Sequence, residues 1–108
     1  MTNRNFGGKL ASVSPSAGVN TFLYSPGRIG FYATIAITNR NAKDVKIRLA
    51  IIDSEDDDIT DLAVDDWIEY DVTIRPNGLI ERDNVAIKDR NSVIVYSDTA
   101  NVNFAIWA

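Results

Sequence analysis

The feature that most constrains the fold of this chain is an alternation of apolar and polar residues that begins near Thr21. Residues 29–38, 45–51 and 68–74 each place an apolar side chain at every second position, and short polar segments separate them. A period of two is typical of a β-strand with one face in a core and the other in solvent. No stretch after Thr21 has the apolar spacing of a helix of more than two turns. The pattern therefore predicts an antiparallel all-β domain.

Predicted turns divide the alternating region into seven or eight short strands. These turns lie at residues 39–41, 76–78, 89–91 and 99–101, and each turn contains an asparagine. This number of strands around one core is typical of a sandwich of two antiparallel sheets. We expect an immunoglobulin-like β-sandwich. A small jelly roll is the alternative, because the number of strands alone does not distinguish these two folds.

The first 20 residues lack this alternation. They are rich in Gly, Ser, Asn and Thr, and their large apolar side chains are those of Phe6, Leu10 and Val13. Such a composition does not favour a packed element of its own, and the two adjacent glycines after Phe6 disfavour a helix. We therefore predict an extended N-terminal arm over residues 1–20, which docks Phe6, Leu10 and Val13 on a neighbouring surface, followed by a β-sandwich domain over residues 21–108.

Length and composition limit the possible functions. A chain of 108 residues has room for one domain, and it contains neither cysteine nor histidine. Disulfides, thiol catalysis, Cys/His zinc sites and Ser-His nucleophiles are thereby excluded, and no phosphate-binding loop is present. We expect no enzymatic activity and no organic cofactor. No segment approaches the ~20 apolar residues of a membrane span, and the N-terminus lacks the apolar region of a signal peptide.

Residues 53–66 carry eight acidic and no basic side chains, whereas the rest of the chain has 11 basic against 7 acidic residues. The simplest interpretation is a solvated loop between strands, whose charges discourage edge pairing. A calcium site is an alternative, with Asp56, Asp58 and Asp61 as ligands, because clustered carboxylates supply the oxygens that calcium prefers. The glycine and the closing glutamate of an EF-hand loop are missing. A third interpretation is docking of this loop against a basic patch on another subunit.

Basic residues lie on the predicted solvent faces. Lys46 and Arg48 point to the same side of one strand, but a nucleic-acid surface would add several aromatic side chains, and Tyr32 is the clear outward candidate. We expect an ordinary solvent face instead, with cross-strand ion pairs. Their acidic partners would be Glu69, Asp71 and Glu81.

Two tryptophans also fall outside the predicted core. Trp67 and Trp107 each lie on the face opposite the apolar stripe of their own strand, as Tyr32 does. Outward aromatic rings either cover strand ends or anchor contacts with other proteins. We therefore treat these three residues as candidate partner contacts.

Two stretches carry a resemblance to a known family. TFLYSPGRIGFYATIAITNRNAKDVKIRLAII is followed by DDWIEYDVTIRPNGLIERDNVAIKDRNSVIVYSDTANVNFAIWA, and together they cover most of residues 21–108. The order and spacing of "LYS.P.G", "NRN…V.IRLAI", "WIEYD..I.PNG.IER" and "V.SD.A.VNFAIW" resemble those of small structural modules in the virions of tailed bacteriophages. The acidic segment is longer than that pattern implies.

The resemblance implies a β-sandwich that stands alone on a capsid or forms part of a neck, tail or fibre protein and binds other virion subunits. The leading expectation is a capsid decoration or cement protein, a homo-oligomer that binds the major capsid protein through its arm and a sandwich face. It would be assembled into the virion in the host cytoplasm, without contact to nucleic acid or membrane. The alternatives are a tail, neck, baseplate or fibre component, and a carbohydrate- or calcium-binding module.

Overall fold

The computed structural model describes residues 9–24, 30–53, 59, 62, 64–88 and 90–108. Within these ranges the chain forms eight strands and one short 3-10 turn. Their bounds are β1 (Lys9–Val13), β2 (Thr21–Tyr24), β3 (Phe31–Asn39), β4 (Val45–Asp53), η1 (Val64–Asp66), β5 (Trp67–Ile74), β6 (Leu79–Ile87), β7 (Asn91–Ser97) and β8 (Val102–Trp107). None of the described segments is a helix long and apolar enough to cross a membrane.

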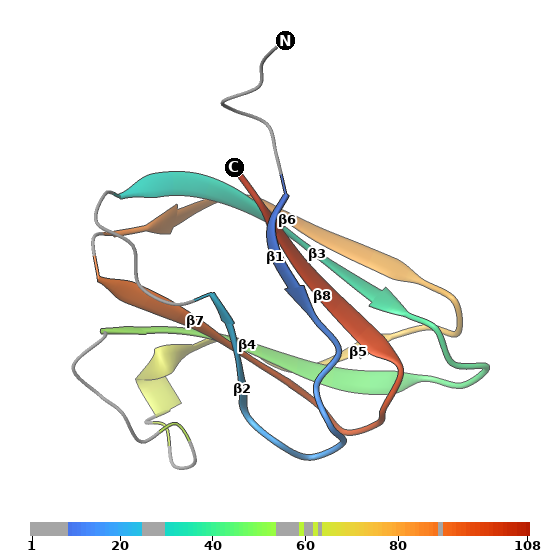
Figure 1. Ribbon diagram of the computed structural model, residues 1–108. Helices are drawn as coiled ribbons and strands as arrows, with labels where there is room; N and C mark the ends of the chain where they lie inside the picture. The colour runs from blue at the N-terminus through green and yellow to red at the C-terminus, as the bar shows by residue number, and fades with distance from the viewer. Residues whose placement is uncertain (1–8, 25–29, 54–58, 60–61, 63, 89) are drawn as a thin grey trace, which may run out of the picture.

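The strands form two antiparallel sheets that face each other (Figure 1). Sheet A has the order β1-β8-β3-β6, and sheet B has the order β2-β7-β4-β5. The first strand thus pairs with the eighth, the second with the seventh, the third with the sixth and the fourth with the fifth. Such nested pairing is that of one long hairpin rolled into two layers, which is a jelly roll.

The predicted two-sheet sandwich is confirmed. Its topology is that of the jelly roll, the alternative to the immunoglobulin-like arrangement. The immunoglobulin-like arrangement is wrong for this chain, because that fold pairs its first two strands directly within one sheet. Here β1 and β2 lie in different sheets. Both folds have similar strand numbers and the same alternation, so the sequence pattern does not distinguish them.

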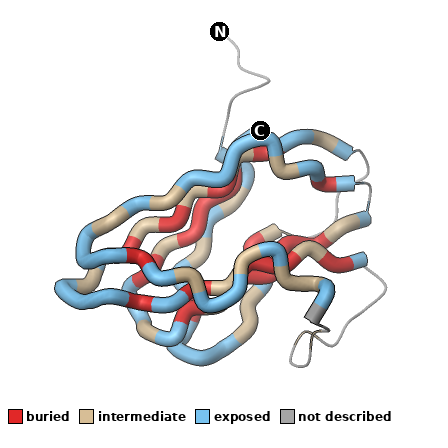
Figure 2. Tube along the Cα trace, turned by 180° about the vertical axis from the view of Figure 1, so that it is seen from behind, coloured by how far each residue is buried: buried red, intermediate tan, exposed pale blue. Residues whose placement is uncertain are grey.

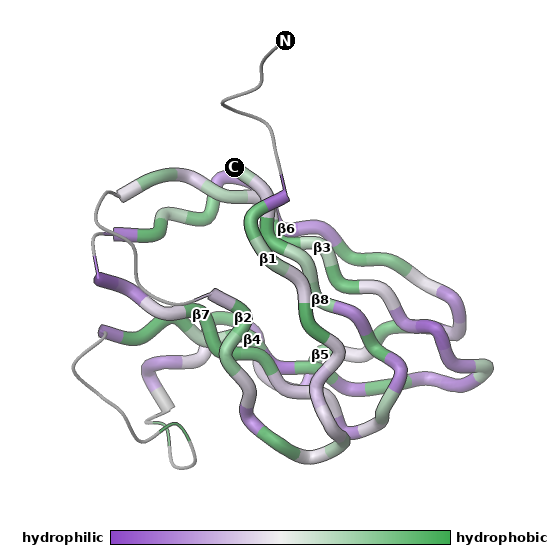
Figure 3. Tube along the Cα trace, in the orientation of Figure 1, coloured by the Kyte–Doolittle hydropathy of each residue, from purple (hydrophilic) through white to green (hydrophobic). Residues whose placement is uncertain are grey.

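The core lies between the sheets, where most of the buried residues of the central strands gather (Figure 2). Green, hydrophobic stretches likewise mark β3, β4, β7 and β8 in Figure 3. The buried apolar side chains are aliphatic apart from one phenylalanine. Among the largest are Phe104, Ile35, Ile37, Ile47, Leu49, Ile74, Ile87 and Ile106.

The boundary predicted at residue 20 is wrong. Residues 9–13 are extended, as expected, but they form β1, which pairs with β8 as an edge strand of sheet A. Ala11 and Val13 lie opposite core residues of β8 and pack against the core. An open edge at β8 supplies hydrogen bonds that the composition of this segment does not reveal. The sandwich therefore begins at or before Lys9.

One face of β5 differs from the sequence prediction. The alternation places Ile68 and Tyr70 in the core with Val72 and Ile74, but these two side chains are 48% and 57% exposed. Asp71 has a positive φ of 53°, and the register between β4 and β5 shifts at this point. A bulge inserts one extra residue and so reverses which side chains point inward. As a result Glu69, and not Tyr70, lies opposite the buried Leu49.

The two long edge strands carry charges on their inner side. Glu69 of β5 and Arg82 of β6 lie opposite Leu49 and Ile35, which are core residues, and the two side chains form an ion pair between the sheets. Inward charges and bulges at edge strands discourage the addition of a further strand. Addition of a further strand at β5 or β6 is therefore disfavoured, which leaves the faces of the sheets as the surfaces available for contacts.

Candidate functional site

The outer face of sheet B carries a cluster built around one arginine. The guanidinium of Arg48 lies 4.2 Å from the ring centre of Tyr70 and 4.3 Å from that of Tyr96, and Trp67 is 5.9 Å away. Its Nε donates a hydrogen bond to Oδ1 of Asp71 at 2.7 Å. We call these five residues the Arg48 cluster. Guanidinium groups are attracted to aromatic faces, and the rings of Tyr70 and Tyr96 come from the two strands on either side of β4.

The strand geometry explains why these residues meet. Arg48 points outward because its neighbours on β4 point into the core, and Tyr96 of β7 lies directly opposite it. Tyr70 and Asp71 reach the same face through the bulge in β5. Trp67 packs edge-on against Tyr70, with their ring centres 6.0 Å apart. Three strands of sheet B thus contribute to one cluster.

The charge of Arg48 is fixed by this environment. The hydrogen bond that Arg48 donates to Asp71 raises the pKa of Arg48 above its already high usual value, against an opposing effect of burial. The side chain is 24% exposed and Asp71 is 39% exposed, so the ion pair reaches the surface. Rings and carboxylate together hold the guanidinium in one position before any partner arrives.

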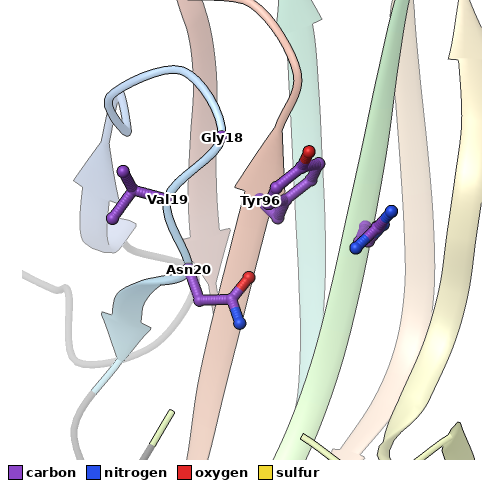
Figure 4. Close-up of a pocket in the computed structure, with 5 residues that line it drawn as sticks. Gly18, Val19, Asn20 and Tyr96 are labelled. Atoms are coloured by element: carbon purple, nitrogen blue, oxygen red, sulfur yellow. The ribbon is translucent and has the colours of Figure 1, made fainter. Parts of the chain in front are cut away.

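A pocket of about 390 Å³ opens beside Arg48 and Tyr96. Its other wall is the connection between β1 and β2, formed by Gly18, Val19 and Asn20 (Figure 4). Gly18 has a φ of 75°, and its N–H donates to the carbonyl of Ser97 at 2.8 Å, which holds the connection close to β7. The volume lies in the range of sites for small ligands or for single anchoring side chains.

The pocket adjoins the acidic segment. Asn20 donates through Nδ2 to the carbonyl of Ile59 at 2.6 Å. Ile59 and Leu62 pack on a buried apolar cluster of sheet B, formed by Ala50, Ile52 and Ile94 with Trp67 against it. Ile59 and Leu62 are therefore packed on the sheet, whereas the simplest interpretation of the sequence treated all of residues 53–66 as a solvated loop.

The candidate calcium ligands Asp56, Asp58 and Asp61 lie outside the described residues. In the described part of the chain, no group of three or more acidic side chains is placed to hold a metal ion. One of the predicted cross-strand ion pairs is present, between Arg48 of β4 and Asp71 of β5. Glu69 forms its ion pair with Arg82 between the two sheets, and not across neighbouring strands of one solvent face.

The predicted partner contacts fall on different surfaces. Tyr32 and Trp107 point outward from sheet A and are 71% and 41% exposed, and Leu10 of β1 is 47% exposed. Trp67 is half-buried on the opposite sheet, within the Arg48 cluster. Val13 belongs to the core of the sandwich and not to a free surface. Phe6 lies outside the described residues.

Sequence reasoning missed most of the Arg48 cluster. Arg48 was expected on a solvent face, but nothing in the chain reveals that Tyr96 lies opposite it, because that contact depends on the pairing of β4 with β7. The outward position of Arg48 was the available signal. The molecule thus presents the Arg48 cluster on one sheet and exposed aromatic side chains on the other. Comparison of the chain with models of known families, with curated proteins and with solved structures finds no match.

Proposed function

We propose that this chain is a structural protein of a tailed-bacteriophage virion and binds a neighbouring virion protein through the Arg48 cluster and the adjoining pocket. The observation that carries the proposal is the position of Arg48 between two tyrosine rings at the edge of that pocket. A few residues supply most of the binding energy at protein interfaces, and arginine, tyrosine and tryptophan are enriched among them. This cluster contains all three.

The cluster is also prepared for binding. Fixing a long side chain on association costs about 0.5–1.5 kcal/mol, and Arg48 is already fixed by its rings and by Asp71. Exposed apolar side chains lie on the same side of sheet B: Val19 in the pocket wall is 50%, Phe22 of β2 43% and Tyr70 57% exposed. Aromatic residues and arginine are the residue types that interfaces contain more often than the rest of a protein surface.

The virion assignment rests on the sequence resemblance described above. A jelly roll agrees with it by analogy, since viral capsid proteins use this fold, although lectin domains and cupins do so as well. Within the virion, the leading proposal is a decoration or cement protein on the major capsid protein. A tail, neck, baseplate or fibre component is the second candidate.

Mass spectrometry of purified virions tests this proposal. We expect the chain among the proteins of intact particles of the phage that encodes it, and in the head fraction after heads and tails are separated. Its presence in tails but not in heads would contradict the decoration protein and support the second candidate. Its presence in infected cells but not in particles would contradict the virion assignment altogether.

A further inference from the structure

The outer face of sheet A has the composition of an interface and not of a solvent face. The outward positions of its two central strands carry no charged residue: they are Tyr32, Thr34, Ala36, Thr38, Asn103, Ala105 and Trp107. The centre is made of small side chains, and Ala105 is only 7% exposed. Depletion of charge at the centre together with exposed aromatic residues distinguishes an interface from ordinary surface.

Charges appear on this face at its two edges, and they have opposite signs. Lys9 lies on β1, and its Nζ is 5.9 Å from the ring centre of Trp107. Glu81 and Asp83 lie on β6 at the other edge. The face is therefore positive along one edge, negative along the other, and uncharged between them.

One row of residues crosses the whole sheet. Lys9 pairs with Trp107, and Trp107 pairs with Thr34. The hydroxyl of Thr34 donates to Oδ1 of Asp83 at 3.1 Å. From β1 to β6, this row therefore contains a cation, an aromatic ring, a hydroxyl group and a carboxylate. The next row, of Ser12, Ala105, Ala36 and Glu81, is small in its middle and ends on a second carboxylate.

Such a row is complementary to a second copy of itself. Consider two copies whose outer faces of sheet A meet, related by a two-fold axis that runs parallel to the strands and passes over the line between β8 and β3. This axis places β1 of one copy opposite β6 of the partner subunit, and β8 of one copy opposite β3 of the partner subunit. It introduces no shift along the strands. Lys9 then meets Asp83 of the partner subunit, and Trp107 covers Thr34 of the partner subunit. Two-fold interfaces repeat each such contact twice. Packed sheets keep their strand directions within about 30° of each other, as this arrangement requires.

We propose that the chain forms a symmetric dimer in which the outer faces of two copies of sheet A pack together, with Trp107 and Tyr32 as apolar anchors and two Lys9–Asp83 ion pairs at the rim. Tyr32 is a diagonal neighbour of Trp107 on this face, within reach of its ring. The dimer does not depend on the virion assignment. It leaves the Arg48 cluster on sheet B free for another partner.

Sedimentation equilibrium of the full chain at several concentrations tests the dimer. We expect a reversible species of twice the 11.9 kDa chain mass. Trp107→Ala is expected to weaken dimerisation at least 100-fold, which corresponds to about 2.8 kcal/mol, since the substitution removes one aromatic anchor from each of the two copies. Lys9→Glu and Asp83→Lys are each expected to weaken it about tenfold, because each sets two like charges against each other.

The double variant Lys9→Glu/Asp83→Lys is the decisive measurement. Within one copy these residues are three strand spacings apart, about 14 Å, and do not pair. Recovery of wild-type affinity in the double variant therefore requires contact between copies. Lys46→Glu, on the outer face of sheet B, is the matched control and is expected to dimerise normally. Circular dichroism confirms that each variant is folded.

Three outcomes would overturn the proposal. The first is a wild-type chain that stays monomeric up to millimolar concentration, in which case this face belongs to a different protein. The second is a dimer that Trp107→Ala and Lys9→Glu leave unchanged. The third is a double variant that dimerises no better than the single ones.

Discussion

Replacing Asn39 by alanine is expected to lower the free energy of unfolding by about 3 kcal/mol, which corresponds to a fall in Tm of about 15 °C for a domain of this size. Asn39 was predicted as a turn residue, but it is the last residue of β3 and is completely buried. Its side chain joins the connection after β3 to the end of β5, which lies 35 residues away in the sequence.

The hydrogen bonds of this side chain explain the size of the effect. Nδ2 donates to the carbonyl oxygens of Lys43, Ile74 and Arg75 at 2.8, 3.1 and 2.9 Å. Oδ1 accepts from the backbone N–H of Asn41 at 2.9 Å and from its side-chain amide at 3.1 Å. Alanine removes all of these bonds at once, and each buried polar group left without a partner costs about 1–3 kcal/mol.

Urea unfolding at one fixed protein concentration measures this change, because self-association would otherwise shift the apparent stability. Thr99→Ala is the control, because Thr99 lies in the connection between β7 and β8, away from the outer face of sheet A. Its hydroxyl donates an exposed hydrogen bond to Oδ1 of Asp98 at 2.9 Å, so its loss is expected to cost less than about 1 kcal/mol. Equal stability of the two alanine variants would contradict the role given to Asn39.

Replacing Phe104 by alanine is expected to have the largest effect, a loss of about 3–5 kcal/mol. Phe104 is the largest completely buried side chain and lies on β8, a central strand of sheet A. The substitution removes apolar contacts and leaves a cavity between the sheets. Because small domains are stable by only about 5–15 kcal/mol, the variant is expected to be partly unfolded at 37 °C.

Thermal unfolding followed by circular dichroism checks this expectation. Phe22→Ala serves as the matched control, since Phe22 is 43% exposed on the outer face of sheet B. We expect that variant to lose about 1 kcal/mol or less. A Phe104→Ala chain that melts within a few degrees of the wild type would mean that the two sheets do not share the core described here.

The sequence was sufficient to predict what depends on alternation alone. Residues 45–51 lie in β4 with Val45, Ile47 and Leu49 buried, and Tyr32 and Trp107 point outward as expected. Alternation reports which residues share a face, because successive side chains of a strand point to opposite sides. It does not report which strand lies next to which.

The features of the fold and of the Arg48 cluster that the sequence did not predict depend on strand pairing and on β-bulges. β1 is a strand because β8 offers it an edge, and the jelly roll differs from an immunoglobulin-like sandwich only in its pairing. The positive φ of Asp71 brings Tyr70 to the outer face beside Arg48, against the pattern of its own strand. Aspartate tolerates this conformation better than most residues, but its presence alone does not mark a bulge.

Hydroxyl-radical footprinting of virion-bound and free protein tests the central claim most directly. If the Arg48 cluster is the docking surface, Phe22 and Tyr70, which are 43% and 57% exposed in the free chain, lose most of their reactivity on the particle. Tyr24, packed against the core, serves as an internal reference that stays unchanged. Undiminished oxidation of Phe22 and Tyr70 in virion-bound protein would contradict the claim.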